Sequence, residues 1–177
     1  PEYDGLKLGF QNLVVECGDR VVLKGVNINM YTKRKALPSD TDFARQTHHA
    51  AYRDVVMRQF GSFDEKTQDK YFAESWKLGN QESLLKDDKK VGYCSIEYLP
   101  NEIIIQQLTI LPEFQSQGIG SELFTDVLKE AKIKGIPVKL QVLKKNRAKN
   151  LYEKLGFKEI GTTDTHFKME FIFTKEL

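Results

Sequence analysis

Two glycines, Gly118 and Gly120, stand in the segment QSQGIGSELF, directly before a run of residues with helical periodicity. The first backbone N–H groups of a helix have no partner within the helix, and they carry the positive end of its dipole. Because glycine has no Cβ atom, an anion can approach the main chain closely at these positions. The segment therefore predicts a pyrophosphate-binding loop. The alternative is a loop that only turns a strand into a helix.

Two common phosphate-binding motifs do not fit this loop. A nucleoside triphosphate site needs GxxxxGK[ST], whereas Gly120 is followed by Ser121 and Glu122 and has no such lysine. A dinucleotide site needs GxGxxG, and the third glycine is replaced by Leu123. The loop therefore favours neither ATP or GTP nor NAD as its ligand.

The elements around the loop determine where it must lie. Strand 102–111 precedes it, and strand 137–143 follows the helix. Between them, apolar residues recur at the spacing of one helical face, at Ile119, Leu123, Phe124, Val127, Leu128 and Ala131. A strand, a crossover helix and a second strand form a right-handed unit, so the two strands should be parallel.

The rest of the chain alternates strand and helix patterns. A β-hairpin is expected around Gly18 and Asp19, leading into a strand near 28–36, and Ser39 or Asp40 should cap the first helix. The further predicted elements are helices over 38–60 and 64–76, strands over 81–86 and 90–99, a helix over 146–156, and strands over 157–163 and 165–173. This order predicts an α+β or mixed α/β sheet with helices packed on its faces.

The composition narrows the class of protein. With 177 residues, 40% of them hydrophobic and a net charge of +2, the sequence predicts a globular protein and gives no case for nucleic acid as a partner. No apolar run approaches the length of a membrane span, and no secretory signal is expected. Cys17 and Cys94 lie far apart without metal-ligand spacing, which disfavours a disulfide framework or a metal site and suits a cytoplasmic location.

Two motifs together resemble the GNAT superfamily of N-acetyltransferases. The first is the Q/R-x-x-G-x-G/A pattern, which appears as Gln115 to Gly120 after a strand ending in LTILPEF. The second is an asparagine before a short helix ending in LYEKxGF, which appears as Asn146 through LYEKLGF. The resemblance is strong over 100–173 and weaker over 30–99. We therefore expect a GNAT acetyltransferase domain over 28–177 and an N-terminal β-hairpin extension over 1–27.

The resemblance implies a fold and an activity. The fold is a mixed, mostly antiparallel sheet whose parallel pair splays at the coenzyme A site, with helices on both faces. The activity is acetyl transfer from acetyl-CoA, as cosubstrate and without a metal, to a small-molecule or peptide primary amine by direct attack in a ternary complex. One alternative is a non-catalytic module that binds acyl-CoA. A homodimer that pairs through the N-terminal hairpin is a further hypothesis.

The resemblance also assigns cofactor-binding residues. The strand before the loop would pair through its backbone with the pantetheine arm, the loop amides would bind the pyrophosphate, and the second motif would add contacts from its short helix. The predicted set is Leu108, Thr109, Ile110, Gln115, Ser116, Gln117, Gly118, Ile119, Gly120, Ser121, Asn146, Lys149 and Tyr152.

Tyr152 is the predicted catalytic acid, because a phenol near the sulfur can donate a proton to the leaving thiolate. Its alternative role is packing. The strand glutamate that some family members use as a base falls at Ile104, which cannot accept a proton. Glu97 alternates with Tyr93 and Ser95 on the neighbouring strand and is the predicted base. The alternative is that Glu97 is an exposed residue without a catalytic role. A chain of waters would then accept the proton.

In folds of this kind the first two helices usually shape the acceptor pocket. The predicted acceptor residues are polar and come from the first helix and from the start of the last strand: His49, Tyr52, Arg53 and His166. For His166 the alternative is a surface position. His48 lies on the apolar stripe of the first helix, which favours a buried structural histidine.

Overall fold

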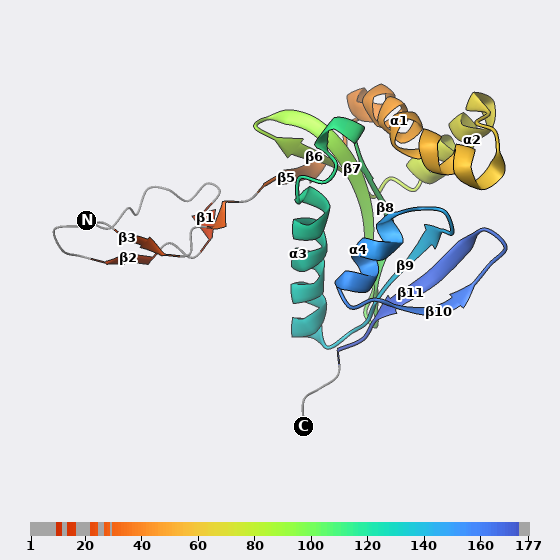
Figure 1. Cartoon of the computed structure of the whole chain (residues 1–177). Helices are drawn as coiled ribbons and strands as arrows, with labels where there is room; N and C mark the ends of the chain where they lie inside the picture. The colour runs from red at the N-terminus through yellow and green to blue at the C-terminus, as the bar shows by residue number, and fades with distance from the viewer. Residues whose placement is uncertain (1–9, 12–13, 17–21, 25–26, 29, 174–177) are drawn as a thin grey trace.

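The computed structural model describes residues 10–11, 14–16, 22–24, 27–28 and 30–173. A seven-stranded sheet in the order β10-β11-β9-β8-β7-β6-β5 forms its centre (Figure 1). These strands are β5 (Thr32–Lys35), β6 (Gln81–Lys86), β7 (Lys89–Tyr98), β8 (Ile103–Ile110), β9 (Val138–Leu143), β10 (Lys158–Thr162) and β11 (His166–Phe171). All neighbours are antiparallel except β8 and β9, which are parallel. The mixed, mostly antiparallel sheet with one parallel pair is confirmed.

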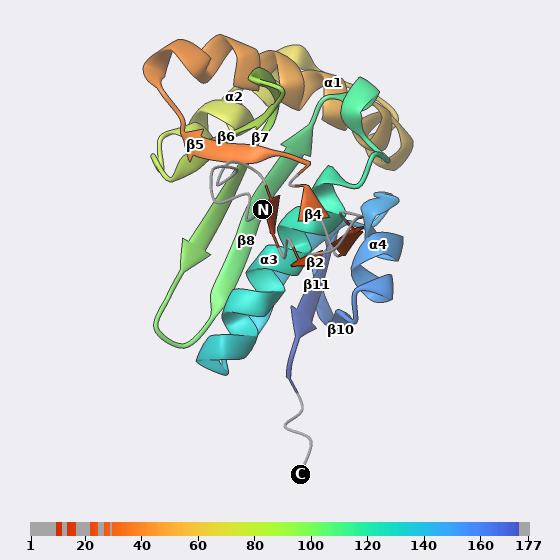
Figure 2. The same ribbon diagram turned by 90° about the vertical axis from the view of Figure 1, so that its left-hand side faces the viewer.

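Helices cover both faces of the sheet (Figures 1 and 2). One face carries α3 (Ile119–Lys134) and α4 (Ala148–Lys154), and the other carries α1 (Thr41–Phe60) and α2 (Glu65–Trp76). Two 3-10 turns, η1 (Pro38–Asp40) and η2 (Pro112–Phe114), precede α1 and the glycine loop. Helices on both faces let each strand bury alternate side chains on two sides.

The face of α3 predicted from its periodicity packs onto the sheet. Its buried side chains are at most 3% exposed and belong to the main core together with β7, β8, β9 and β11: Ile119, Leu123, Phe124, Val127 and Ala131. Fully burying an apolar side chain contributes about 1.5–3 kcal/mol. The helix ends at Gly135, whose left-handed φ of 67° stops it, as the sequence predicts.

The parallel pair is short, and a β-bulge lies beside the point where it ends. β8 and β9 pair only from Ile103 with Val138 to Ile105 with Leu140. Across β7, Ser95 opposes Gln107 and Ile96 opposes Ile105, so Gln106 is an extra residue in β8. Strands that stop pairing while both continue must diverge, and this divergence creates the space for a site.

The start of α1 differs from the sequence prediction. Asp40 is the N-cap residue by position, but its carboxylate makes no capping hydrogen bond to the helix, and Ser39 does not cap it either. Instead, Asp40 is 2% exposed and accepts hydrogen bonds from Arg34, Lys90, Ser83 and the Leu37 backbone N–H. The prediction of a helix cap was wrong because cations from β5 and β7 bind the carboxylate more strongly than helix amides do.

Four short strands precede the sheet: β1 (Phe10–Gln11), β2 (Val14–Glu16), β3 (Val22–Lys24) and β4 (Asn27–Ile28). β2 pairs antiparallel with β3, and β1 pairs antiparallel with β4. The turn predicted at Gly18 and Asp19 lies outside the described residues, as does Cys17. Among the described helices, none is both long and apolar enough to cross a membrane.

Candidate active site

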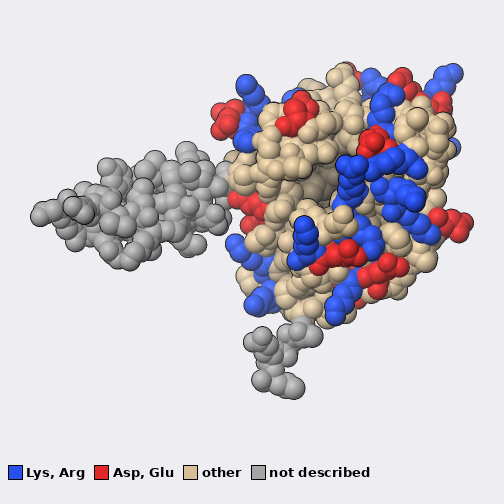
Figure 3. Space-filling model, viewed as in Figure 1, with Lys and Arg blue, Asp and Glu red and all other residues tan. Residues whose placement is uncertain are grey.

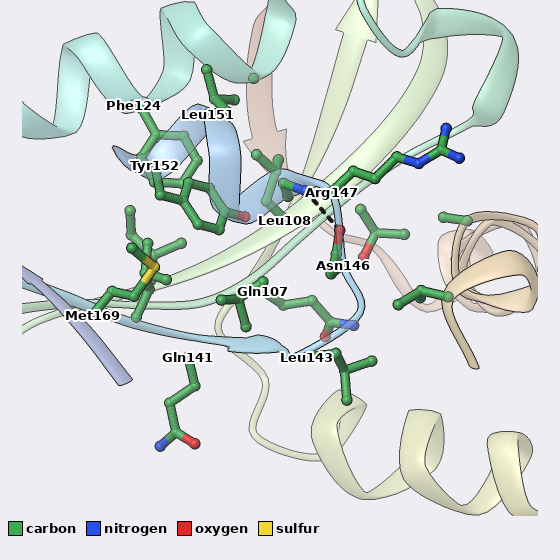
Figure 4. A pocket seen from close by; sticks show the side chains of 18 of the residues that line it. Gln107, Leu108, Phe124, Gln141, Leu143, Asn146, Arg147, Leu151, Tyr152 and Met169 are labelled. Atoms are coloured by element: carbon green, nitrogen blue, oxygen red, sulfur yellow. Dashed lines mark hydrogen bonds between the residues drawn. The ribbon is translucent and has the colours of Figure 1, made fainter. Parts of the chain in front are cut away.

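A cleft of about 1290 Å³ opens where β8 and β9 diverge. Its lining comes from these two strands, from β11 and α1, and from the starts of α3 and α4. Figure 4 shows Tyr152 and Asn146 on one side of the β9 ribbon and Gln141 and Leu143 on the other. The cleft therefore reaches both faces of the sheet, so two ligands can approach one point from opposite sides.

The glycine loop forms one end of this cleft. Ser116 and Gly118 have left-handed φ angles of 60° and 91°, and α3 begins immediately afterwards at Ile119. No described side chain caps the first amides of α3. Gly118 and Gly120 both line the cleft. The loop thus presents helix amides and two positions without Cβ atoms, which is the chemistry that a pyrophosphate requires.

Side-chain hydrogen bonds hold the loop in this shape. Gln115 Nε2 donates to the Ile110 carbonyl at 2.8 Å. Gln117 Nε2 donates to the Glu113 carbonyl at 2.7 Å. Both glutamines therefore fold the chain back over η2 and keep the amides of α3 directed at the cleft.

All but three of the predicted cofactor-binding residues line the cleft, the exceptions being Gln117, Ile119 and Lys149. The Ile119 side chain is fully buried in the core. Lys149 forms an ion pair with Glu153, and its ammonium lies 4.7 Å from the centre of the Phe167 ring. Both side chains have other partners, so any contact from Ile119 to a cofactor must come from its backbone.

Replacing Gly118 by alanine is expected to weaken coenzyme A binding about tenfold and to destabilise the fold by about 1–2 kcal/mol. A non-glycine residue pays roughly that energy in the left-handed region. The new Cβ would also lie 2.9 Å from Met30 Sδ, so the loop would have to shift. Isothermal titration with coenzyme A and urea unfolding measure the two effects.

Gly135→Ala is the matched control for this variant. Gly135 also has a left-handed φ, but a Cβ there meets nothing within 4 Å, and the residue lies at the far end of α3. Gly135→Ala should lose stability and still bind coenzyme A normally. Wild-type affinity in both variants would show that the shape of the loop does not matter for binding.

Tyr152 projects into the cleft from α4. Its ring packs against Phe124 and Phe157, with centroid distances of 5.0 and 6.1 Å. Within the described part of the chain its hydroxyl has no hydrogen-bond partner, and Figure 4 shows it directed into the pocket. Burial raises the pKa of the phenol, so the group keeps its proton at neutral pH and is available as a donor.

Asn146 lies where β9 leads into α4. Its Oδ1 accepts a hydrogen bond from the Ala148 backbone N–H at 2.9 Å, which is the dashed line in Figure 4. The side chain therefore starts α4 as well as lining the cleft. It fixes the helix that carries Tyr152.

Gln59 is a structural contributor that the sequence pattern did not indicate. Its Oε1 accepts from the Lys145 N–H at 3.0 Å, and its Nε2 donates to the Thr165 carbonyl at 2.9 Å. One amide from α1 thereby connects the loop before Asn146 with the loop before His166. The partners lie 86 and 106 residues away, so no local signal could have identified the contact.

The predicted base, Glu97, lies outside the cleft lining. Its carboxylate accepts a hydrogen bond at 2.8 Å from Gln106, which is the bulge residue and does line the cleft. Gln106 in turn accepts from Ser95 and Asn80. Glu97 is thus separated from the cleft by one amide, and its role as a base stays a prediction.

The four predicted acceptor residues separate into two pairs. Tyr52 and His166 line the cleft, and burial lowers the pKa of His166, so its ring is neutral at neutral pH. His49 lies 3.1 Å from Asp69, and Arg53 contacts Glu65 at 3.1 Å. These two side chains instead face α2 and the segment before it.

His48 is buried, at 6% exposure, as the apolar stripe predicts. Its ring stacks on Tyr52 at 4.6 Å, and its Nδ1 lies 3.5 Å from the Tyr93 hydroxyl and 3.4 Å from Gln107 Nε2. Burial lowers the pKa of His48 to about 4. The neutral ring therefore supports the floor of the cleft, where Gln107 and Tyr52 are exposed to it.

The charged residues of the lining were not identified from the sequence either. They are Asp54 and Arg58 from α1, Lys139 from β9, Arg147 at the start of α4, and Lys168 from β11. Figure 3 shows Lys and Arg side chains gathered along one side of a hollow on this face. Across the described ranges, no three His, Cys, Asp or Glu side chains are grouped to hold a metal ion.

Comparison with known proteins agrees with this geometry. Residues 81–159 match the sequence model of the acetyltransferase (GNAT) domain. Over 85 residues the chain is 28% identical to the [ribosomal protein bS18]-alanine N-acetyltransferase of Haemophilus influenzae. That match covers 48% of this chain and 58% of the relative, so the chain spans little more than half the length of this curated protein.

Solved structures show the same fold. The PaiA N-acetyltransferase of Thermoplasma acidophilum in complex with coenzyme A superimposes with a TM-score of 0.67 at 22% identity, covering 81% of this chain and 99% of that one. The ribosomal-protein-S18-alanine N-acetyltransferase of Escherichia coli gives a TM-score of 0.57 at 22% identity, covering 84% and 99%.

Proposed function

Because the chain carries a GNAT acetyltransferase domain, the fold of an acyltransferase family, we propose that it transfers an acetyl group from acetyl-CoA to a primary amine. The observation that carries the proposal is the cleft between β8 and β9, which has the glycine loop at one end and the Tyr152 side chain in its lining. The amine attacks the thioester directly while both substrates are bound.

The residues present fit coenzyme A. Gly118 and Gly120 leave the amides of α3 open to the pyrophosphate, and Arg147 adds a cation to the lining next to Asn146. Beyond Ile105 the β9-facing edge of β8 has no ladder partner, so an extended arm can pair with its backbone near Leu108. The Ile110 carbonyl on this edge already accepts a hydrogen bond from Gln115 Nε2. Together these residues would hold the pyrophosphate and the pantetheine arm of coenzyme A.

The proton balance of the reaction needs one donor and one acceptor. The amine nitrogen forms a bond to the acetyl carbon, the C–S bond breaks, and the sulfur leaves with a negative charge. The amine is protonated at neutral pH and first releases one proton to solvent, which leaves the neutral nucleophile. Tyr152 then donates its proton to the sulfur and recovers one from the nitrogen, which must lose a second proton to become an amide. The products are the acetylated amine and coenzyme A with a free thiol.

For the acceptor we propose a peptide amine. The curated relative is named for acetylation of an alanine of a ribosomal protein. On the face that carries α1, the exposed side chains of Gln141 and Lys168 line the cleft, so solvent and a longer acceptor can reach it there. A small-molecule amine is the alternative, and an amine panel that includes peptides, amino acids and polyamines separates the two.

A second candidate function is an acyl-CoA-binding module without catalysis. The observation that favours it is the absence of a free carboxylate in the described lining, since Asp54 is paired with Arg58 and Glu97 lies behind Gln106. Tight coenzyme A binding without release of free thiol from any amine in the panel would support this function. Turnover of any amine would reject it.

Millimolar acetyl-CoA is expected to raise the melting temperature, whereas ATP and NAD are not. A ligand that binds only the folded state stabilises it by about 2.7 kcal/mol at a hundredfold excess over Kd. For a domain of this size that corresponds to a shift of roughly 5–10 °C. A thermal-shift assay with the three ligands measures this. Equal shifts with all three would contradict a specific coenzyme A site.

We also propose that residues 28–177 form the acetyltransferase domain and that 1–27 are an extension, with the protein acting in the cytoplasm. If the extension pairs two subunits through an edge strand, the full chain will be a dimer in solution and a chain beginning at residue 28 will be a monomer. The same oligomeric state for both chains would show that the extension has no such role.

A further inference from the structure

Positively charged side chains outnumber negatively charged ones in the described lining of the cleft. Arg58, Lys139, Arg147 and Lys168 are cations, and Asp54 is the one carboxylate in the described lining. The Asp54 carboxylate lies 2.8 Å from the Arg58 guanidinium one turn along α1. A substrate that entered the cleft would therefore meet several cations and no free anion.

The cations belong to two sides of the sheet. Arg147 lies next to Asn146 at the start of α4 (Figure 4). α4 lies on the same face of the sheet as α3, which follows the glycine loop (Figure 1). Lys168 lies on β11 opposite Gln141 of β9, and His166 lies opposite Leu143. Paired residues of adjacent strands project to the same face. Leu143 packs against Val55 of α1, so Lys168, Gln141 and His166 share the face covered by α1.

Lys168 differs from the other cations on that face. The Lys139 ammonium contacts Glu102 and lies 3.8 Å from Glu170. Lys168 has no carboxylate within ion-pair distance among the residues that the structure describes, and its side chain is exposed. Its stem lies beside Gly161, the residue opposite it on β10. Among the described residues, Lys168 is thus a cation without an ion-pair partner. It lies on the α1 side of the cleft, where we expect the acceptor to enter.

We propose that the acceptor is a peptide amine followed by acidic side chains, and that Lys168 binds one of those carboxylates. The inference rests on the proposed acetyl transfer and assigns its substrate class. The entrance on the α1 side has a free cation, an exposed amide in Gln141 and a neutral imidazole in His166, which together suit a carboxylate. The coenzyme A phosphates are expected at the opposite side, near Arg147, so they leave Lys168 available.

The positive charge of the cleft lining also disfavours polyamines and basic peptides as acceptors. A cationic acceptor needs carboxylates near its remaining charges, and the one lining carboxylate is already bound by Arg58. Like charges placed close together reduce both association rate and affinity.

The test compares kcat/KM for two peptides that share an N-terminal alanine and carry either two glutamates or two lysines at the next positions. Free glutamate and spermidine are included as small-molecule acceptors. At low salt the acidic peptide should be preferred about 1.4- to fivefold, since one exposed charge pair contributes about 0.2–1 kcal/mol. The preference should shrink in 0.5 M NaCl because salt screens exposed charges.

Lys168→Glu should abolish or reverse this preference while the affinity for coenzyme A stays the same. Lys129→Glu is the matched control, because Lys129 is an exposed lysine on α3 and the change in net charge is identical. An equal rate with the acidic and basic peptides would overturn the inference, as would a Lys168→Glu enzyme with the wild-type preference. Faster turnover of spermidine or free glutamate than of either peptide would overturn the peptide assignment. No turnover of any acceptor would contradict the acetyl transfer itself.

Discussion

Tyr152→Phe is expected to lower kcat by about 100-fold or more while the Kd for coenzyme A changes less than twofold. Proton transfer by a positioned side chain contributes about 10²–10⁴-fold to rate. Phenylalanine keeps the ring contacts with Phe124 and Phe157, so only the hydroxyl is lost. Steady-state release of free thiol measures kcat, and calorimetric titration measures binding.

Tyr98→Phe is the control for this experiment. Tyr98 ends β7, is 41% exposed and lies outside the cleft lining, so removal of its hydroxyl should leave kcat unchanged. A Tyr152→Phe enzyme with wild-type kcat would remove the hydroxyl from the reaction and assign Tyr152 to packing alone. A large increase in Kd would indicate instead that the hydroxyl binds the cofactor.

Asp40→Ala is expected to destabilise the fold by about 2–4 kcal/mol. Loss of one partner of a buried ion pair costs about 3–5 kcal/mol, and the lower range applies here because Arg34 and Lys90 are partly exposed. The variant also leaves the Ser83 hydroxyl without this acceptor. Urea unfolding at pH 7 measures the change. Asp42→Ala, at an exposed position two residues further along the chain, should stay within about 0.5 kcal/mol of wild type.

The contribution of Asp40 to the stability of the fold should depend on pH. The Arg34 guanidinium, together with the hydrogen bonds from Leu37, Lys90 and Ser83, holds the pKa of this carboxyl well below its usual range. A carboxyl with a lowered pKa stabilises the fold above its unfolded pKa of about 3.9, and the contribution is lost as the pH falls further. The difference in the free energy of unfolding between wild type and Asp40→Ala should therefore become smaller as the pH falls from 5 to 2. A constant difference would show that Asp40 acts through packing rather than charge.

The order of helices and strands from β5 to β11 could be predicted because each has a local pattern. The apolar stripe of α3 and its end at Gly135 illustrate this, since both follow from spacing and backbone freedom. The position of the glycine loop was also predictable, because its two glycines stand between a strand pattern and a helix pattern. Asp40 was mistaken for a cap because its partners come from β5, β6 and β7, and their arrangement follows only from the folded sheet.

The acceptor side was less predictable for a related reason. Tyr52 and Arg53 are neighbours in the sequence, yet one lines the cleft and the other contacts Glu65, because a helix turns by 100° per residue and its rotation depends on packing. Glu97 was placed on the correct strand, but the bulge at Gln106 inserts an amide between it and the cleft. Gln59 and Lys168 gain their roles from contacts that no single segment encodes.

The early end of the β8–β9 ladder also has a consequence for solubility. Beyond Ile105 and Leu140 the two strands present unpaired backbone groups to each other, which amounts to a pair of edge strands inside the sheet. Exposed edges of this kind promote strand-to-strand aggregation. Here α1 packs beside β8 on one face of the sheet, and α3 packs beside β8 and β9 on the other. These helices restrict the access of another protein's strand to the two edges, while the cleft leaves them available to a ligand.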